Sequence, residues 1–282
     1  MDNKIVYLNG EYLPLNEAKV SVLDRGFLFG DGVYEVIPAY YGKLFLFHEH
    51  LARLNNSLKL IQLPILYDEQ QWLDILNPLL TEDQDQYIYL QITRGVVNKR
   101  DHAFPEEIQP TVFAMCSPIT HFSERNKGVK AITLDDTRWE LCHVKATTLL
   151  ANILLRQKAV EQDCAEAILV KDNIVTEGAA SNVFAVIDNI LTTPPINNEI
   201  LPGITRQLII KLAKKHQIPV AERPITLNEL LTANEIWLTS STREILPVVE
   251  LDKKPVGNGQ PGQVWKTMHH LFQQAKKHTY ER

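Results

Sequence analysis

The sequence predicts an α/β protein of the α+β kind, with a smaller N-terminal domain and a larger, barrel-like C-terminal domain. In the first 120 residues the expected strands and helices are grouped, which is typical of α+β folds. A polar, charged stretch at residues 121–127 indicates a linker. Beyond it, many short strands with frequent changes from strand to loop favour a barrel over a doubly wound sheet. We therefore expect domains at residues 1–120 and 128–282, and 282 residues suffice for two cores.

Composition excludes several classes of function. The net charge is −5 and no segment concentrates Lys and Arg, so nucleic acid and anionic membranes are poor partners. No apolar run approaches the length of a membrane span, and the first residues lack a secretion signal. The cysteines Cys116, Cys142 and Cys164 are odd in number and stand in apolar contexts without CxxC pairs. We expect free thiols, no metal site and a reducing cytoplasm.

Turn residues and apolar spacing place the elements of the first domain. Asn9-Gly10 predicts a tight hairpin turn, and Gly42 predicts a second. Leucines at positions 51, 54 and 58 lie on one face of a helix. The expected strands are 4–8, 11–15, 33–41, 44–47, 87–93 and 111–116, and the expected helices are 48–61 and 68–80.

The second domain is expected to contain shorter elements. Thr147 or Thr148 could cap a helix that carries Leu149, Ile153 and Val160. Ser240, Ser241 and Thr242 form a hydroxyl cluster between two strands. The expected strands are 129–134, 165–171, 183–187, 190–193 and 235–239, and the further helices are 205–216, 227–232 and 263–277.

Lys145 is the first candidate for chemistry. It stands among apolar and small residues just before an expected helix. Desolvation there favours the neutral amine, which a Schiff-base nucleophile needs. Taken alone, a lysine that extends from a strand end into solvent explains the same sequence, because most lysines are solvated.

Glu177 is the second candidate, because the small residues after it would allow a planar ring to approach closely. A carboxylate paired with a pyridinium nitrogen keeps that nitrogen protonated and makes the ring an electron sink. A simple turn glutamate after Thr176 is the alternative.

A phosphate site is the third feature. Gly203-Ile204-Thr205 opens an expected helix, whose free N–H groups and dipole favour an anion. Thr242 lies in a second hydroxyl-rich turn, and Arg53 could add a fixed positive charge. Each also has a plain structural explanation: Arg53 as a solvated helix residue, and Thr205 as a helix cap. Leu201 could fill the core or press on one face of a ring.

Together these residues resemble the signature of the fold-type-IV pyridoxal-phosphate enzymes, the class IV aminotransferases. The family pattern is a Glu, small residues, an Asn, an apolar and an aromatic residue, then a spaced Thr and an apolar-x-Gly-apolar-x-Arg. Its long fixed spacing makes it far more specific than any single element. The matching residues here are Glu177, Asn182, Val183, Phe184, Thr193, Leu201, Gly203, Ile204 and Arg206. The likeness runs along nearly the whole chain.

The resemblance implies a role for each candidate. Lys145 would form the Schiff base with pyridoxal 5′-phosphate, and Glu177 would pair with its pyridine nitrogen. Leu201 would support the ring. The phosphate would be held by Arg53, Ile204, Thr205, Ser241 and Thr242.

Within the family, the likeness is greatest to the D-amino-acid transaminases, because of an Arg-x-His loop. Arg100 and His102 match this loop, and Tyr34 matches a tyrosine that joins them in binding the substrate α-carboxylate. An arginine can grip a carboxylate with two parallel hydrogen bonds. The side on which the carboxylate is fixed decides which α-hydrogen faces Lys145. In the family the loop comes from the neighbouring subunit, which implies a homodimer acting on small amino acids and 2-oxo acids.

Some residues leave other readings open. Arg243 and Glu140 are charges that the pattern does not require; Arg243 could widen acceptance of acidic substrates or point to solvent. A branched-chain L-aminotransferase would normally lack the Arg-x-His loop. An aminodeoxychorismate lyase would release pyruvate instead of exchanging amines. A non-catalytic binding protein on this fold would not need Lys145.

Overall fold

The computed structural model describes residues 4–120 and 123–280. They group into two compact units: unit 1 comprises Met1–Thr120 and Val144–Thr148, and unit 2 comprises His121–His143 and Leu149–Arg282. The expected linker at 121–127 lies partly outside the described residues, and its described part includes a short 3₁₀ helix, η2 (Ser123–Asn126), within unit 2. No helix in the described ranges is long and apolar enough to cross a membrane.

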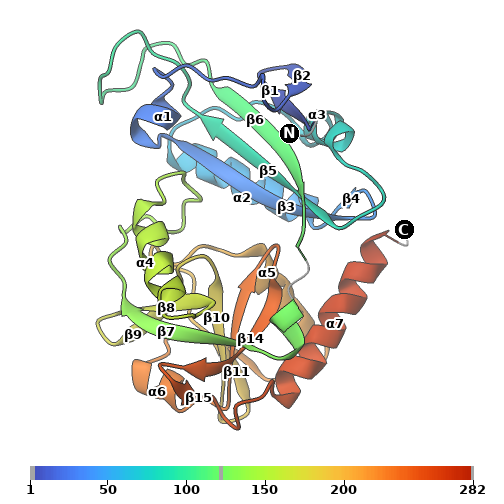
Figure 1. Ribbon diagram of the computed structural model, residues 1–282, viewed down its shortest axis with the longest axis vertical. Helices are drawn as coiled ribbons and strands as arrows, with labels where there is room; N and C mark the ends of the chain where they lie inside the picture. The colour runs from blue at the N-terminus through green and yellow to red at the C-terminus, as the bar shows by residue number, and fades with distance from the viewer. Residues whose placement is uncertain (1–3, 121–122, 281–282) are drawn as a thin grey trace. The chain divides into compact units, whose positions relative to one another are not determined.

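Unit 1 is built on a six-stranded antiparallel sheet with the order β2-β1-β6-β5-β3-β4 (Figure 1). Its strands are β1 (Ile5–Leu8), β2 (Glu11–Pro14), β3 (Gly32–Tyr40), β4 (Lys43–Leu44), β5 (Gln86–Thr93) and β6 (Thr111–Pro118). Its helices are α1 (Arg25–Phe29), α2 (Phe47–Leu60), α3 (Glu69–Leu76) and the 3₁₀ turn η1 (Asn77–Leu79). The apolar stripe of α2 packs on the sheet in one core with Trp72 and Ile88.

The hairpin signals in unit 1 are confirmed. Asn9 and Gly10 both have positive φ, as the tight turn between β1 and β2 requires. Tyr41 and Gly42 do the same between β3 and β4. The expected strand 44–47 is wrong in length, because Phe47 already begins α2. Helix α1 was not expected, since its Gly26 and flanking glycines disguise a single helical turn.

Unit 2 contains a mixed nine-stranded sheet with the order β12-β11-β10-β13-β14-β7-β8-β9, and β15 pairs with β14. The strands are β7 (Val129–Asp135), β8 (Glu166–Lys171), β9 (Ile174–Gly178), β10 (Asn182–Ile187), β11 (Ile190–Thr193), β12 (Val220–Glu222), β13 (Glu235–Ser240), β14 (Glu244–Leu251) and β15 (Lys254–Pro255). The helices are α4 (Leu150–Val160), α5 (Ile204–Lys215), α6 (Leu227–Leu231) and α7 (Gln263–Tyr280).

The connection between β9 and β10 curls this sheet. Strand β9 is the last in the sheet order and β10 the third, yet only residues 179–181 separate them in sequence. Gly178 closes the connection by donating its N–H to the carbonyl of Ser181 at 2.6 Å. So short a link brings one end of the sheet round to strands near the other, as the barrel-like expectation required.

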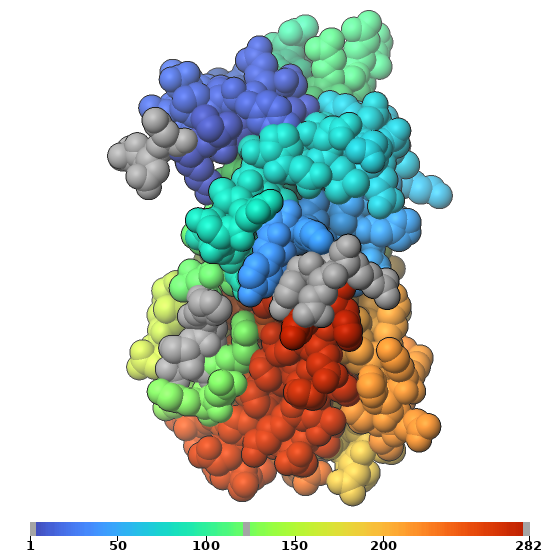
Figure 2. Space-filling model, turned by 90° about the vertical axis from the view of Figure 1, so that its right-hand side faces the viewer, coloured from blue at the N-terminus to red at the C-terminus, as the bar shows by residue number. Residues whose placement is uncertain are grey.

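Helix α7 lies on the surface of unit 2. It packs against α5 and against β13 and β14, and Figure 2 shows it (red) on the face turned toward the viewer. On the buried side, Trp265, Met268 and Phe272 are almost fully covered. The helix extends to Tyr280, three residues beyond the expected end.

One expectation around residues 144–150 is wrong. Neither Thr147 nor Thr148 caps α4: its N-cap is Leu149, and the Thr147 hydroxyl donates to the carbonyl of Gly30 at 2.8 Å. Segment 144–148 also groups with unit 1, although the sequence placed it in the second domain. The reason is backbone pairing, because Ala146 bridges to Val33 in antiparallel fashion.

Candidate active site

Lys145 is held against strand β3 of unit 1. Its carbonyl accepts a hydrogen bond from the Tyr34 N–H at 3.0 Å, and its own N–H donates to the Ser57 hydroxyl at 3.3 Å. Its Nζ lies 4.2 Å from the centroid of the Tyr34 ring, within the distance range of a cation–π contact. The structure therefore brings together Lys145 and Tyr34, two residues that the sequence singled out for different roles.

A buried ion cluster lies in the same unit. Glu35 is fully buried on β3, and Arg53 of α2 grips it with two bonds, Nε to Oε1 at 2.7 Å and Nη2 to Oε2 at 2.8 Å. His50 adds a contact from Nδ1 to Oε2 at 2.8 Å; since a carboxylate only accepts, this nitrogen carries the proton. Burial alone would raise the pKa of Glu35, but Arg53 and His50 outweigh it and hold that pKa far below its usual range.

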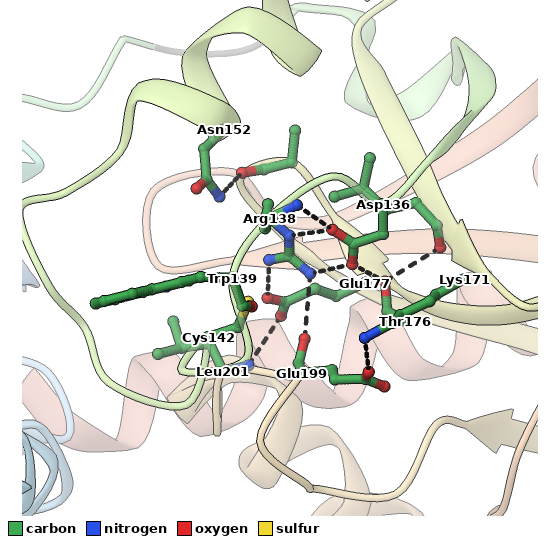
Figure 3. A network of polar contacts seen from close by, with 12 residues as sticks. Asp136, Arg138, Trp139, Cys142, Asn152, Lys171, Thr176, Glu177, Glu199 and Leu201 are labelled. Atoms are coloured by element: carbon green, nitrogen blue, oxygen red, sulfur yellow. Dashed lines mark hydrogen bonds and ion pairs between the residues drawn. The ribbon is translucent and has the colours of Figure 1, made fainter.

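Glu177 lies on β9 of unit 2 and is 5% exposed, so it is a strand residue and not a turn residue. Its Oε1 accepts from Arg138 Nη1 at 2.6 Å (Figure 3). Its Oε2 accepts from Asn182 Nδ2 at 2.9 Å and from the Leu201 N–H at 3.1 Å. Burial raises the pKa of Glu177 to about 7, against the charge and hydrogen bond of Arg138. A cation placed beside this carboxyl would therefore lower its pKa and favour release of its proton.

Arg138 shares its guanidinium among several acceptors. Nε and Nη2 bond both oxygens of Asp136 at 2.9 and 2.7 Å, and Nη2 also reaches the carbonyl of Glu199 at 3.1 Å (Figure 3). The Thr176 hydroxyl donates to Asp136 at 2.7 Å and fixes that carboxylate. Arg138 thus gives Glu177 one hydrogen bond and Asp136 two.

The start of α5 provides free backbone donors. The N-cap residue is Gly203, so no N-cap side chain bonds the first backbone N–H groups of the helix. Ile204 and Thr205 in the first turn are buried. A Cβ at position 203 would lie 1.9 Å from Asn182 Oδ1, so only glycine fits between the helix and Asn182. The uncapped first turn, next to a glycine that lets the chain approach closely, is a suitable binding site for an anion.

The predicted hydroxyl turn is also in unit 2. Ser241 and Thr242 lie half-buried in the turn between β13 and β14. Arg243 beside them donates Nη1 to the carbonyl of Ala165 at 3.3 Å and lies 3.7 Å from Oε2 of Glu166. The charge of Arg243 is therefore directed at a buried carboxyl of its own unit.

The other unusual charge is at the surface. Glu140 is 83% exposed, and its Oε1 lies 3.7 Å from Lys171 Nζ. Lys171 makes a closer contact of 2.6 Å with Glu199.

The Arg-x-His loop is exposed in unit 1. The side chain of Arg100 lies over the Phe29 ring at 5.1 Å, and the His102 ring is 5.2 Å from the same ring. Within the described residues, no hydrogen bond, ion pair or ring contact joins either of them to Tyr34 or Lys145. The three proposed carboxylate ligands are therefore not assembled by bonds within one protomer.

Comparison with known proteins decides the family. The sequence profile described as Amino-transferase class IV matches residues 32–251, well over half of the chain. The chain belongs to the class IV aminotransferases. Curated relatives of this class IV aminotransferase include the D-alanine aminotransferase of Staphylococcus haemolyticus, 40% identical over 271 residues that cover 95% of this chain and 96% of the relative. The D-alanine aminotransferase of Bacillus licheniformis is 39% identical over 273 residues, with 96% of each chain covered.

Solved structures share the fold of this class IV aminotransferase. The branched-chain amino acid aminotransferase of Escherichia coli superposes with a TM-score of 0.89 at 27% identity, covering 97% of this chain and 94% of its own. A hypothetical aminotransferase from Mycobacterium tuberculosis, in a PLP-bound form, gives a TM-score of 0.84 at 26% identity, covering 96% and 98%. The expected fold class is thereby confirmed.

The residues of this class IV aminotransferase fit a phosphorylated pyridine cofactor. The buried carboxyl of Glu177, whose pKa is raised, would be stabilised in its charged form by a ring cation. The uncapped start of α5 offers donors to a phosphate. Arg53, however, already bonds both oxygens of Glu35, so its expected contact with a phosphate stays a prediction.

Sequence reasoning missed the partners of these groups. Glu35 was not singled out, although a charged residue stands there on the apolar face of β3 between Val33 and Ile37. That placement alone signals a buried partner. Asp136 was also missed; its spacing of two residues from Arg138 was the only local sign of their ion pair.

Proposed function

We propose that the protein is a D-amino-acid transaminase, which converts D-alanine and 2-oxoglutarate into pyruvate and D-glutamate with pyridoxal 5′-phosphate. The arrangement that carries the proposal is Glu177 held between Arg138, Asn182 and the backbone of Leu201. Relatives about 40% identical along nearly the whole chain, all named D-alanine aminotransferase, favour the D-series over the branched-chain L-enzymes, which match at 27%.

The cofactor would supply an electron sink for the carbanion at Cα. Glu177 would face its ring nitrogen, and the backbone and side chain of Leu201 would lie beside the ring. Its phosphate would lie at the N–H groups of Ile204 and Thr205, with further donors from Ser241, Thr242 and Arg53.

Lys145 would bind the cofactor covalently and then move the proton. Its free amine would then act as the base that takes the proton from the substrate Cα and as the acid that returns it. The reaction would be ping-pong, because the first 2-oxo acid would leave before the second one binds; the same lysine would serve both half-reactions. Its position over the Tyr34 ring restrains the amine between these steps.

Tyr34, Arg100 and His102 would bind the substrate carboxylate, with the loop donated across a homodimer. Exposure of the loop supports this assignment, because Arg100 and His102 lie at the surface, where a second subunit would contact them. Exposed apolar residues on α4 support a partner subunit, with Leu150, Ile153 and Leu154 each more than half exposed.

We assign the reaction to the cytoplasm, where the free cysteines Cys116, Cys142 and Cys164 would stay reduced. We further propose the functional domains 1–120 and 128–282; the segment 144–148, which carries Lys145, groups with unit 1.

The test is a spectrophotometric assay of D-alanine against L-alanine, each with 2-oxoglutarate, on the cofactor-loaded enzyme. We expect pyruvate only from the D-enantiomer, with the K145A variant as the inactive control. Turnover confined to L-leucine or L-isoleucine would replace this proposal with a branched-chain enzyme. Pyruvate released from aminodeoxychorismate without an amino acceptor would replace it with a lyase.

A further inference from the structure

A single arginine of unit 1 holds the loop that carries Arg100 and His102. Arg25 stands at the start of α1, and its side chain is only 4% exposed. Its Nη1 donates to the carbonyls of Asp101 at 2.6 Å and Ala103 at 3.1 Å, and its Nη2 donates to that of His102 at 3.2 Å. Three consecutive carbonyls of an exposed loop without helix or strand are thus bonded to one buried guanidinium.

The charge of Arg25 is balanced from the other side. Asp31 accepts from Arg25 Nε at 2.8 Å and from Arg94 Nε at 2.8 Å and Nη2 at 3.0 Å. Burial raises the pKa of Asp31, but hydrogen bonds from both arginines outweigh it and the pKa is lowered. Arg94 also stacks under the Phe104 ring at 3.6 Å, which fixes the far end of the loop. Asp31 takes only the Nε of Arg25, so the Nη1 and Nη2 donors of Arg25 remain available to the loop carbonyls.

The base of this anchor is rigid. Asp24 caps α1 by accepting from the Gly26 N–H at 2.7 Å, and it accepts the hydroxyls of Thr93 at 2.8 Å and Thr111 at 2.6 Å on the sheet. A Cβ at position 26 would lie 2.2 Å from Thr93 Cγ2, so glycine lets the helix turn approach β5. Arg25 is therefore fixed relative to the sheet by its own backbone.

The side chains of the loop rest on the same helical turn. Phe29 ends α1, and its ring contacts Arg100, His102 and the guanidinium of Arg25 at 4.9 to 5.2 Å. Helix α1 thus orders both the backbone and the two side chains that would bind a carboxylate.

We propose that Arg25 is a positioning residue for the substrate carboxylate, acting through Arg100 and His102 without touching the substrate. This inference rests on the proposed function, in which those two residues bind the carboxylate. By ordering the loop before substrate arrives, Arg25 removes much of the entropy cost of binding. Its loss raises KM for substrates that carry a carboxylate and leaves the proton transfer at Lys145 unchanged.

The test compares R25K, R100A, the double variant and K99A in the cofactor-loaded enzyme. Lysine keeps a charge beside Asp31 but cannot supply the arginine fork. K99A is the matched control, because Lys99 is a cation of the same loop whose side chain is 82% exposed. We expect R25K to raise KM for D-alanine about tenfold, since each lost hydrogen bond is worth about 1 kcal/mol, with kcat within about threefold. K99A keeps the wild-type KM.

A second measurement separates positioning from general damage. Single-turnover reaction with benzylamine, an amine without a carboxylate, is followed by the absorbance of the bound cofactor. R25K reacts with it at the wild-type rate. R25K raises KM for D-alanine less in the R100A background than in the wild type, because only His102 is then left to be positioned. If R25K fails to fold, F29L, which keeps apolar volume and removes the ring, is measured instead and raises KM several-fold by the same reasoning.

Three results overturn the inference. Equal loss of rate with D-alanine and benzylamine makes Arg25 a purely structural residue. An unchanged KM in R25K, or additive effects of R25K and R100A, removes the link to Arg100. Failure of the proposed function gives a different signature, because R100A alone would then leave KM for D-alanine unchanged.

Discussion

Glu35 in unit 1 and Glu177 in unit 2 are both buried carboxyls paired with an arginine, yet their pKa values shift in opposite directions. Arg53 gives Glu35 two bonds and His50 adds a third contact, so the charge is fully compensated. Arg138 gives Glu177 a single bond, because its other donors are bound to Asp136.

The difference separates a structural carboxylate from a functional one. Glu35 needs no further cation, and its ion pairs with His50 and Arg53 connect β3 to α2. Glu177 is under-compensated, and a further cation would stabilise its charged form. A carboxylate that is to bind a ring cation must be incompletely compensated by the protein. A carboxylate already fully paired would gain little stabilisation from the added cation.

The largest expected effect is the loss of transaminase activity when Lys145 is replaced, with little change in stability. Replacing Lys145 by alanine removes the proton-transfer group beside β3 but leaves the Glu35 cluster intact. We expect transaminase activity to fall by about 10³-fold or more, with the free energy of unfolding changed by less than about 1 kcal/mol. Activity in K145A near the wild-type level, measured with D-alanine, would rule out its proposed role.

Glu35→Gln tests whether that carboxylate is structural. It leaves Arg53 buried without its counter-charge, so we expect a loss of about 3–5 kcal/mol in the free energy of unfolding. Urea denaturation of the cofactor-free protein measures it, with the exposed Glu82→Gln as control. A loss no greater than that of the control would mean that the two carboxyls do not differ in the way described.

Glu177→Gln should act in the opposite direction on the cofactor-free protein. The folded pKa of about 7 lies above the ordinary value of 4.5, so the folded state binds the proton more tightly than the unfolded chain. The free energy of unfolding of the wild type therefore falls as pH rises from about 4.5 to about 7. We expect Glu177→Gln to be more stable than wild type at pH 8, by up to about 3 kcal/mol.

The pH dependence is the sharper part of that prediction. Near pH 5 the wild-type carboxyl is protonated and resembles the amide, so the difference in unfolding free energy should shrink toward zero. A difference that is constant from pH 5 to pH 8 in urea titrations would contradict a raised pKa. The same variant should lose transaminase activity when loaded, because the amide cannot hold a ring cation.

The smallest effect is expected from replacing Arg243, whose partner Glu166 is a third buried carboxyl beside an arginine. It lies 3.7 Å from Glu166 without a close hydrogen bond, and burial leaves the pKa of Glu166 raised. We expect Arg243→Ala to raise that pKa further and to cost about 1 kcal/mol of unfolding free energy at pH 8. KM for 2-oxoglutarate should change less than about twofold; a large rise would mean that Arg243 reads acidic substrates.

Local patterns were readable from the sequence, and long-range pairings were not. Asn9-Gly10 specifies its turn through backbone conformation, and the spacing from Glu177 to Arg206 specifies a family. Arg138 and Glu177, in contrast, are 39 residues apart and meet only because β9 passes beside the segment after β7. No helical or strand periodicity encodes that contact.

The segment around Lys145 illustrates the same limit. Its position after the expected linker suggested the second domain, and Thr147 suggested a helix cap. The helix cap is wrong, because Thr147 donates to Gly30, and the backbone of this segment pairs with β3. Local propensity could not anticipate a pairing with a strand more than a hundred residues earlier.

The proposed pairing of Glu177 with a ring cation is tested most directly by measuring the pKa of Glu177. Carbon NMR of the labelled side-chain carboxyl gives this pKa in the cofactor-free and in the pyridoxal-phosphate-loaded protein. Glu177→Gln identifies the resonance. We predict a midpoint near 7 without the cofactor and a carboxylate that stays charged throughout the same pH range with it. An identical titration in both forms would show that no ring cation faces Glu177.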